Sequence, residues 1–289
     1  MAGVAARRTP ASWRRGAVAS RDDDAMATEP RTVTVWQGRV PFRVHVEGEG
    51  PAVVFFHGPW GLHWGPFLDA LARRFTIYAP EHPGTTPGQP DTIHQIDNLW
   101  DLVLCYDELF DRLEIADAAL VGHSFGAMVA CEVAAHRPAR ARRLMLLDPI
   151  GLWRDDAPVI NWMLVPPQEL PGYVFRDDDG APAKALFSVP DDLEDGALAK
   201  TRLTWAMGCT GKFIWPIPDK GLKKRIHRIQ TPALLVWGED DRLVPRVYAE
   251  EFARRLPKTQ LEVVTGAGHA PHLEQPDAVA RLALSFLGA

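Results

Sequence analysis

Ser124 lies in a Gly-x-Ser-x-Gly pattern between an apolar run and a helical pattern. Ala119–Val121 predicts a strand, Gly122-His123-Ser124-Phe125-Gly126 follows it, and Ala127–Ala135 predicts a helix. Glycines on both sides let the backbone turn sharply without Cβ clashes, which leaves the serine hydroxyl exposed above a sheet. The pattern therefore predicts a serine nucleophile at a strand-to-helix turn. The alternative is a tight turn at which Ser124 merely caps the helix.

A base and an acid for this serine are found in two later loops. A serine hydroxyl is a weak nucleophile until a histidine takes its proton, and that histidine needs a carboxylate to fix its tautomer and stabilise its positive charge. The apolar run Leu234–Trp237 leads into Gly238-Glu239-Asp240-Asp241, and Leu261–Val264 leads into Gly266-Ala267-Gly268-His269. Both loops follow strands at the same expected edge of the sheet, in the chain order Ser, Asp, His.

With these motifs, the chain from about Arg31 to its C-terminus resembles the α/β-hydrolase superfamily. In that family's pattern the acid is the last Asp of a Gly-x-x-Asp stretch after the seventh strand, which matches Asp241. The base sits in a Gly-His after the eighth strand, which matches His269. The resemblance implies a catalytic triad of Ser124, Asp241 and His269.

Other carboxylates and histidines near the triad are weighed separately. Glu239 and Asp240 are alternative acids that we expect to be solvated, and Asp148 is a further rival because it ends the sixth expected strand. His272 follows His269 by three residues, but no metal-ligand spacing such as His-Glu-x-x-His occurs, so no metal site is expected. His123 is expected to pack beneath the turn, away from the position of the base.

Two N–H donors are needed for the oxyanion of an acyl-transfer reaction. Phe125, directly after the serine, supplies the first. The loop His57-Gly58-Pro59-Trp60-Gly61 resembles the family's His-Gly-x-x loop, but Pro59 has no N–H to offer. Trp60 N–H is therefore the expected second donor and Gly61 N–H the next candidate, while His57 is expected to hold the loop.

The elements that position these residues alternate between short β-rich runs and helical patterns, which is typical of a mostly parallel sheet covered by helices. The last six runs are continuous apolar stretches of the kind found when both faces of a strand are covered. The sequence thus predicts an α/β fold with an eight-stranded, mostly parallel α/β-hydrolase sheet. The expected strands are Thr32–Trp36, Phe42–Val46, Val53–Phe56, Thr76–Ala79, Ala118–Val121, Leu144–Leu147, Leu234–Trp237 and Leu261–Val264.

About 80 residues between the sixth and seventh runs break this alternation and are rich in Pro, Trp and Asp. A loop of this length is uncommon, so the simplest account is an inserted helical lid over 149–230, with the core at 30–148 and 231–289. Helices are expected around Pro158–Leu164 and Leu193–Met207, and Gly221–Ile229 returns the chain to the sheet. The many aromatic residues of the insertion suit an apolar or aromatic substrate.

Composition limits the remaining possibilities. The 289 residues carry 32 Lys and Arg against 37 Asp and Glu, a net charge of −5 without basic clusters in the body of the chain, so nucleic acid is not an expected partner. No apolar run approaches the ~20 residues of a membrane-spanning helix, and three cysteines without a Cys-x-x-Cys pair fit a reducing cytoplasm. Residues 1–29 are expected to be a disordered extension; a transit peptide or an upstream start codon are alternatives. The number of subunits is not predicted.

The function expected from the resemblance is cleavage of an ester or lactone through an acyl-enzyme, because a serine at the turn points to acyl transfer. Hydrolysis of a C–C bond in a diketone-like substrate is the close alternative, since such enzymes share the serine triad and the lid. A non-catalytic receptor on the same fold is a third possibility. Dinucleotide-binding and P-loop patterns are missing from the sequence, so no cofactor is expected.

Overall fold

The computed structural model describes residues 29–288. The predicted N-terminal extension therefore lies, apart from Glu29, outside the described residues. Within the described range, no helix has both the length and the apolar composition needed to cross a bilayer.

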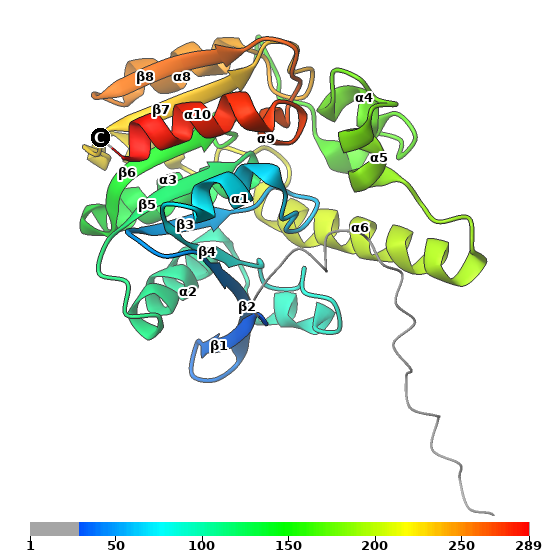
Figure 1. Ribbon diagram of the computed structural model, residues 1–289, viewed down its shortest axis with the longest axis horizontal. Coiled ribbons are helices and arrows are strands. Elements are labelled where there is room, and N and C mark those ends of the chain that lie inside the picture. The colour runs from blue at the N-terminus through cyan, green and yellow to red at the C-terminus, as the bar shows by residue number, and fades with distance from the viewer. Residues whose placement is uncertain (1–28, 289) are drawn as a thin grey trace, which may run out of the picture.

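An eight-stranded sheet forms the centre of the molecule (Figure 1). Its spatial order is β1-β2-β4-β3-β5-β6-β7-β8, β2 is antiparallel to both of its neighbours, and every other pair is parallel. The predicted eight-stranded, mostly parallel sheet is thus confirmed. The strands are β1 Arg31–Val35, β2 Val40–Glu47, β3 Ala52–Phe56, β4 Thr76–Pro80, β5 Ala118–His123, β6 Ala141–Leu147, β7 Ala233–Gly238 and β8 Thr259–Val264.

Helices cover both faces of this sheet. Two apolar clusters fill the layers: one joins the sheet to α1 and α10, and the other joins it to α2, α3 and α8. The helices outside the insertion are α1 Pro66–Ala72, α2 Leu99–Arg112, α3 Phe125–His136, α8 Val247–Arg255, α9 Pro271–Glu274 and α10 Pro276–Leu287, with 3-10 turns η1 Pro90–Gln95 and η2 Pro138–Arg140.

Local sequence explains where these elements begin. Asn98 starts α2 because its side chain accepts hydrogen bonds from the N–H groups of Trp100 and Asp101, which have no acceptor within the helix. Two details differ from prediction. Trp36 lies in the turn after β1 with φ 57°. Three of the six residues of β8 are exposed, including Leu261, because β8 is the last strand of the sheet.

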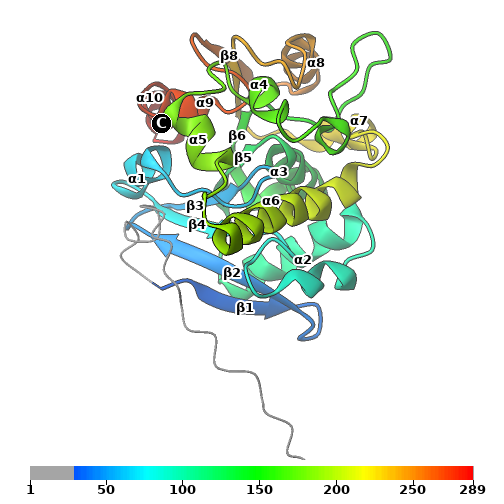
Figure 2. The ribbon, with the colours of Figure 1, turned by 90° about the vertical axis from the view of Figure 1, so that its right-hand side faces the viewer.

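The segment between β6 and β7 contains helices α4 Leu170–Val174, α5 Ala181–Phe187, α6 Leu193–Ile214 and α7 Leu222–Arg225, with 3-10 turns η3 Trp162–Leu164 and η4 Ile226–Arg228. The predicted helix at Leu193–Met207 exists and continues to Ile214. The helix predicted at Pro158–Leu164 is wrong, because only the η3 turn forms there. Figure 2 shows α4, α5 and α6 in front of one edge of the sheet.

The register between neighbouring strands brings their carboxyl ends to the same side of the sheet. Phe56 pairs with Gly122, His123 with Leu147, and Gly238 with Val264, so the carboxyl ends of β3, β5, β6, β7 and β8 lie together. The loops that follow these strands carry the residues for which the sequence predicts chemistry.

Candidate active site

The turn between β5 and α3 holds Ser124 in a strained backbone conformation. Ser124 has φ 52° and ψ −113°, a region that costs a non-glycine residue on the order of 1–3 kcal/mol. The flanking glycines permit the turn: a Cβ on Gly122 would lie 2.6 Å from Cα of Ala127, and one on Gly126 would lie 2.1 Å from the carbonyl oxygen of Phe56. The glycines are therefore required by close packing at the turn.

Ser124, His269 and Asp241 are brought together by these loops. Nδ1–H of His269 donates to Oδ2 of Asp241 at 2.8 Å, so Nε2 is left to accept the hydroxyl proton of Ser124, whose Oγ is also 2.8 Å away. The side chains of His269 and Asp241 are 0% and 1% exposed, and Ser124 is fully buried. This is the hydrogen-bonding order and tautomer that a serine nucleophile and its general base need.

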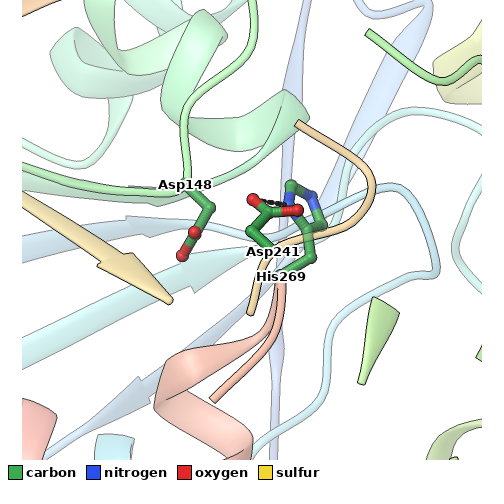
Figure 3. Close-up of side chains that lie close together, drawn as sticks. All are labelled: Asp148, Asp241 and His269. Carbon is green, nitrogen blue, oxygen red and sulfur yellow. Dashed lines mark hydrogen bonds and ion pairs between the residues drawn. The ribbon is translucent and has the colours of Figure 1, made fainter. Parts of the chain in front are cut away.

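The rival acids lie in different surroundings. Glu239 is exposed, and Asp240 forms an ion pair with Arg176 at 3.2 Å on the surface. Asp148 is buried beside Asp241, as Figure 3 shows, but Nδ1–H of His269 donates its hydrogen bond to Asp241. Of these carboxylates, only Asp241 has the contact to Nδ1 of His269 among the described residues.

The loop after β3 is held by two neutral histidines. Nδ1–H of His57 donates to the carbonyl of Gly58 at 2.7 Å, and its Nε2 accepts the backbone N–H of His82 at 2.9 Å. Nε2–H of His82 returns a hydrogen bond to the carbonyl of His57, while its Nδ1 accepts the hydroxyl of Tyr106 at 2.6 Å. Burial lowers the pKa of His57 far below its usual value and that of His82 to about 4. His57 thus occupies the loop-holding position expected of it.

The three backbone N–H groups that the sequence nominates for the oxyanion have no acceptor of their own among the described residues. The N–H groups of Phe125, Trp60 and Gly61 have no acceptor within residues 29–288. Phe125 begins α3, where the first N–H groups point out of the helix. The indole Nε1 of Trp60 is also buried without a partner in the described part of the chain, a polar donor beside the same loop that sequence reasoning did not consider.

His123 and Glu274 hold the loop of the base. Nε2–H of His123 donates to the carbonyl of His269 at 2.8 Å, and burial lowers the pKa of His123 far below its usual value, so it stays neutral. Glu274 accepts the N–H of Gly268 at 2.6 Å and that of Arg176 at 2.8 Å. Sequence reasoning missed Glu274, because nothing in its sequence context distinguishes it from a surface carboxylate.

Aromatic side chains of the segment between β6 and β7 lie against the site. The Trp60 ring contacts those of Trp162 and Phe187, with centroids 6.2 and 5.6 Å away, and Phe213 stacks on Phe125 at 6.0 Å. Two cavities flank these contacts: one of about 300 Å³ borders Trp60, and one of about 520 Å³ borders Trp162. These ring contacts give the site an apolar side, whereas the 300 Å³ cavity is also lined by the charged residues Arg43, Glu81 and Arg202.

The fold and this arrangement define an α/β hydrolase with a Ser-His-Asp constellation. Residues 53–282 match the model of the alpha/beta hydrolase family, and the chain belongs to that family. The relatives whose names state an activity are hydrolases, which supports an enzyme of the hydrolase class.

Named relatives catalyse different hydrolyses. The chain is 27% identical over 286 residues to a 2-hydroxy-6-oxo-6-phenylhexa-2,4-dienoate hydrolase of Burkholderia cepacia, covering 90% of this chain and 97% of the relative. It is 26% identical over 272 residues to a pimeloyl-[acyl-carrier protein] methyl ester esterase of Vibrio atlanticus, covering 84% and 96%. A solved meta-cleavage product hydrolase from Pseudomonas fluorescens is similar in fold, with TM-score 0.71 and 20% identity over 89% of this chain and 97% of that one.

Proposed function

We propose that the protein is a serine hydrolase that cleaves an ester or lactone of an apolar or aromatic small molecule through an acyl-enzyme. The observation that carries this proposal is the pair of 2.8 Å contacts that join Asp241 to His269 and His269 to Ser124. Fluorophosphonate labelling of Ser124 is the first test, because a working serine hydrolase accepts this probe and a non-catalytic receptor does not.

In the proposed reaction, Oγ of Ser124 attacks the carbonyl carbon while Nε2 of His269 takes its proton. Asp241 stabilises the resulting imidazolium, and the N–H groups of Phe125 and Trp60 bind the oxyanion. Collapse of the tetrahedral intermediate breaks the C–O bond, and His269 gives its proton to the departing alkoxide. Water, deprotonated by His269, then attacks the acyl-enzyme and releases the acid with the serine hydroxyl restored.

We further propose that residues 149–230 act as a lid over this site. Ser124 and His269 are 0% exposed, and α4, α5 and α6 lie in front of the strand ends, so a substrate must enter past this segment (Figure 2). Trp162, Phe187 and Phe213 line its inner side against Trp60 and Phe125. An apolar or aromatic acyl group suits such surroundings, because its burial releases water from apolar surface.

Hydrolysis of a C–C bond is the alternative, favoured by the similarity to the dienoate hydrolase of Burkholderia cepacia. Such a reaction uses a serine triad as well, but the leaving group is a carbon and must be protonated there. The triad geometry does not separate the two reactions. The assay must therefore distinguish a substrate with an alkoxide leaving group from one with a carbon leaving group.

The experiment compares substrates on one enzyme preparation. We would measure kcat/KM for p-nitrophenyl esters of several chain lengths, aryl esters, lactones and 2-hydroxy-6-oxo-6-phenylhexa-2,4-dienoate, with Ser124→Ala as the control. Higher kcat/KM for esters or lactones supports the proposal. A clear preference for the dienoate would replace it with C–C hydrolysis, and failure to react with any probe or substrate would favour the receptor.

A further inference from the structure

Two carboxyl groups are buried side by side at the ends of β6 and β7. Asp148 is 0% exposed, the side chain of Asp241 is 1% exposed, and an oxygen of each lies with a ring nitrogen of His269 inside a 4.8 Å cluster (Figure 3). Two ionised carboxylates at this separation repel each other, and both would be cut off from water. One of the two must therefore carry a proton in the folded protein.

The number of hydrogen-bond donors decides which carboxyl is ionised. Oδ1 of Asp241 accepts the N–H groups of Leu243 and Val244 at 2.8 and 2.9 Å, and its Oδ2 accepts Nδ1–H of His269. Asp148 receives one donor, the N–H of Gly238 at 2.9 Å on Oδ1. Its Oδ2 accepts no hydrogen bond within residues 29–288, and the Asp148 side chain is hydrogen-bonded to that of Asp241. Hydrogen bonds that a carboxyl accepts stabilise its charged form. Because Asp241 accepts three such bonds and Asp148 accepts one, the negative charge lies on Asp241.

We propose that Asp148 is a positioning residue, protonated at neutral pH, that donates its carboxyl proton to Asp241 and so keeps Asp241 ionised and directed at His269. Burial, followed by the charge of Asp241, raises the pKa of Asp148 well above its usual value. The other titratable groups that face it are His269 and Glu274, and the charge of Glu274 raises the pKa of Asp148 further. The effect on turnover rests on the proposed serine mechanism, whereas the protonation does not.

A purely structural role is the competing account. Oδ1 of Asp148 ties the end of β6 to the N–H of Gly238 in β7, and Asp148 itself has φ 44°, so the residue could serve only the backbone. Asp148→Asn separates the two accounts. It keeps an oxygen for Gly238 and a donor for Asp241, but it removes the titratable proton. Asp148→Ala removes all three.

Infrared difference spectroscopy tests the protonation without using activity. The spectrum of the wild type minus that of Asp148→Asn at pH 7 should contain the C=O band of a protonated carboxylic acid, shifted in D₂O. A difference spectrum with carboxylate bands only would overturn the proposal. Because no turnover is involved, this result is independent of whether the protein is an esterase.

Stability against pH gives a second readout that a merely structural residue would not change. The folded pKa of Asp148 is raised, so its stabilising contribution is complete below the unfolded pKa of about 3.9 and is lost as pH rises toward the folded value. Asp148→Asn does not titrate. Its melting temperature should therefore exceed that of the wild type by several degrees at pH 8, and the gap should close toward pH 4. A gap that is constant or widens toward acid would contradict the proposal.

Turnover completes the test. Asp148→Asn should keep kcat within about fivefold of the wild type, whereas Asp148→Ala should lose about 10- to 100-fold in kcat, the effect of a hydrogen bond to a charged group, with KM little changed. If folded Asp148→Asn is as inactive as Asp241→Asn, Asp148 acts as an ionised acid and the proposal fails. Activity that chelation abolishes and a divalent cation restores would show that the acid pair binds metal, which also overturns it. Failure of fluorophosphonate labelling in the wild type would refute the serine mechanism alone.

Discussion

Asp241→Asn exchanges one oxygen for an NH₂ group in the centre of the proposed triad. The amide oxygen can keep the position of Oδ1, where it accepts the N–H groups of Leu243 and Val244. The amide nitrogen then faces Nδ1 of His269, so two donors meet. The imidazole relieves this by moving its proton to Nε2, and Nε2 can no longer accept the proton of Ser124.

The expected magnitude follows from that tautomer change. A fall in kcat of about 10⁴ is typical when a catalytic imidazole is held in the wrong tautomer, which corresponds to about 5.4 kcal/mol in activation free energy. Stability should change little because both backbone donors keep an acceptor. Asp241→Ala differs: it leaves two buried N–H groups unpaired at about 1–3 kcal/mol each, and each kcal/mol lowers the melting temperature of a protein of this size by roughly 2–4 °C.

The assay measures kcat on p-nitrophenyl butyrate, the rate of fluorophosphonate labelling and the melting temperature of each variant. Asp240→Asn is the matched control, since Asp240 adjoins Asp241 in sequence but pairs with Arg176 at the surface and should change kcat less than about twofold. If Asp241→Asn keeps kcat within tenfold of the wild type while Asp148→Asn loses the factor of about 10⁴, the acid is misassigned and the reasoning from donor counts is refuted.

Three further outcomes are expected. Ser124→Ala should lose fluorophosphonate labelling and several powers of ten in kcat with its fold intact; retained labelling would point to another nucleophile. Trp60→Phe keeps the backbone N–H that we assign to the oxyanion and removes an indole N–H without a partner in the described residues, so kcat should stay within about fivefold of the wild type. A far larger fall in kcat at constant KM would indicate that the indole Nε1–H, and not the backbone N–H of Trp60, binds the oxyanion. His272→Phe concerns a histidine whose pKa burial lowers to about 3, so the wild type loses stability as pH falls from about 6.5 toward 3. Between pH 7 and 4.5 the melting temperature of this variant should decline less than that of the wild type. Equal declines would contradict the lowered pKa of His272.

Much of the sheet could be predicted from the sequence because buried parallel strands are short apolar runs bounded by turns. The runs that pack on both faces, such as Val53–Phe56 and Leu144–Leu147, form strands in the structure. The run at Leu261–Val264 also forms a strand, but β8 pairs on one side only and exposes Leu261. Hydrophobicity along the chain does not show which strand ends at the border of a sheet.

The segment between β6 and β7 was less predictable because its helices are short and depend on tertiary contacts. Asp192 caps α6 by accepting the N–H groups of Glu194 and Asp195, a local signal that places the start of that helix correctly. By contrast, α4 spans only five residues, and its last carbonyl, on Val174, accepts the N–H of His269 at 2.7 Å. A helix held by a loop almost a hundred residues away leaves no periodic pattern in its own sequence.

The choice between Asp148 and Asp241 shows what kind of information the sequence lacks. Both carboxyls follow buried strands at the same edge of the sheet, so position alone allows either one to serve as the acid. What separates them is the backbone beyond β7, which turns two N–H groups onto Asp241, while Asp148 receives a single N–H from Gly238. Since each such bond favours the charged form of a carboxyl, backbone geometry assigns the charge to one acid and the proton to the other. The residue types set the chemistry that is possible, and the turns around them determine which carboxyl carries the charge.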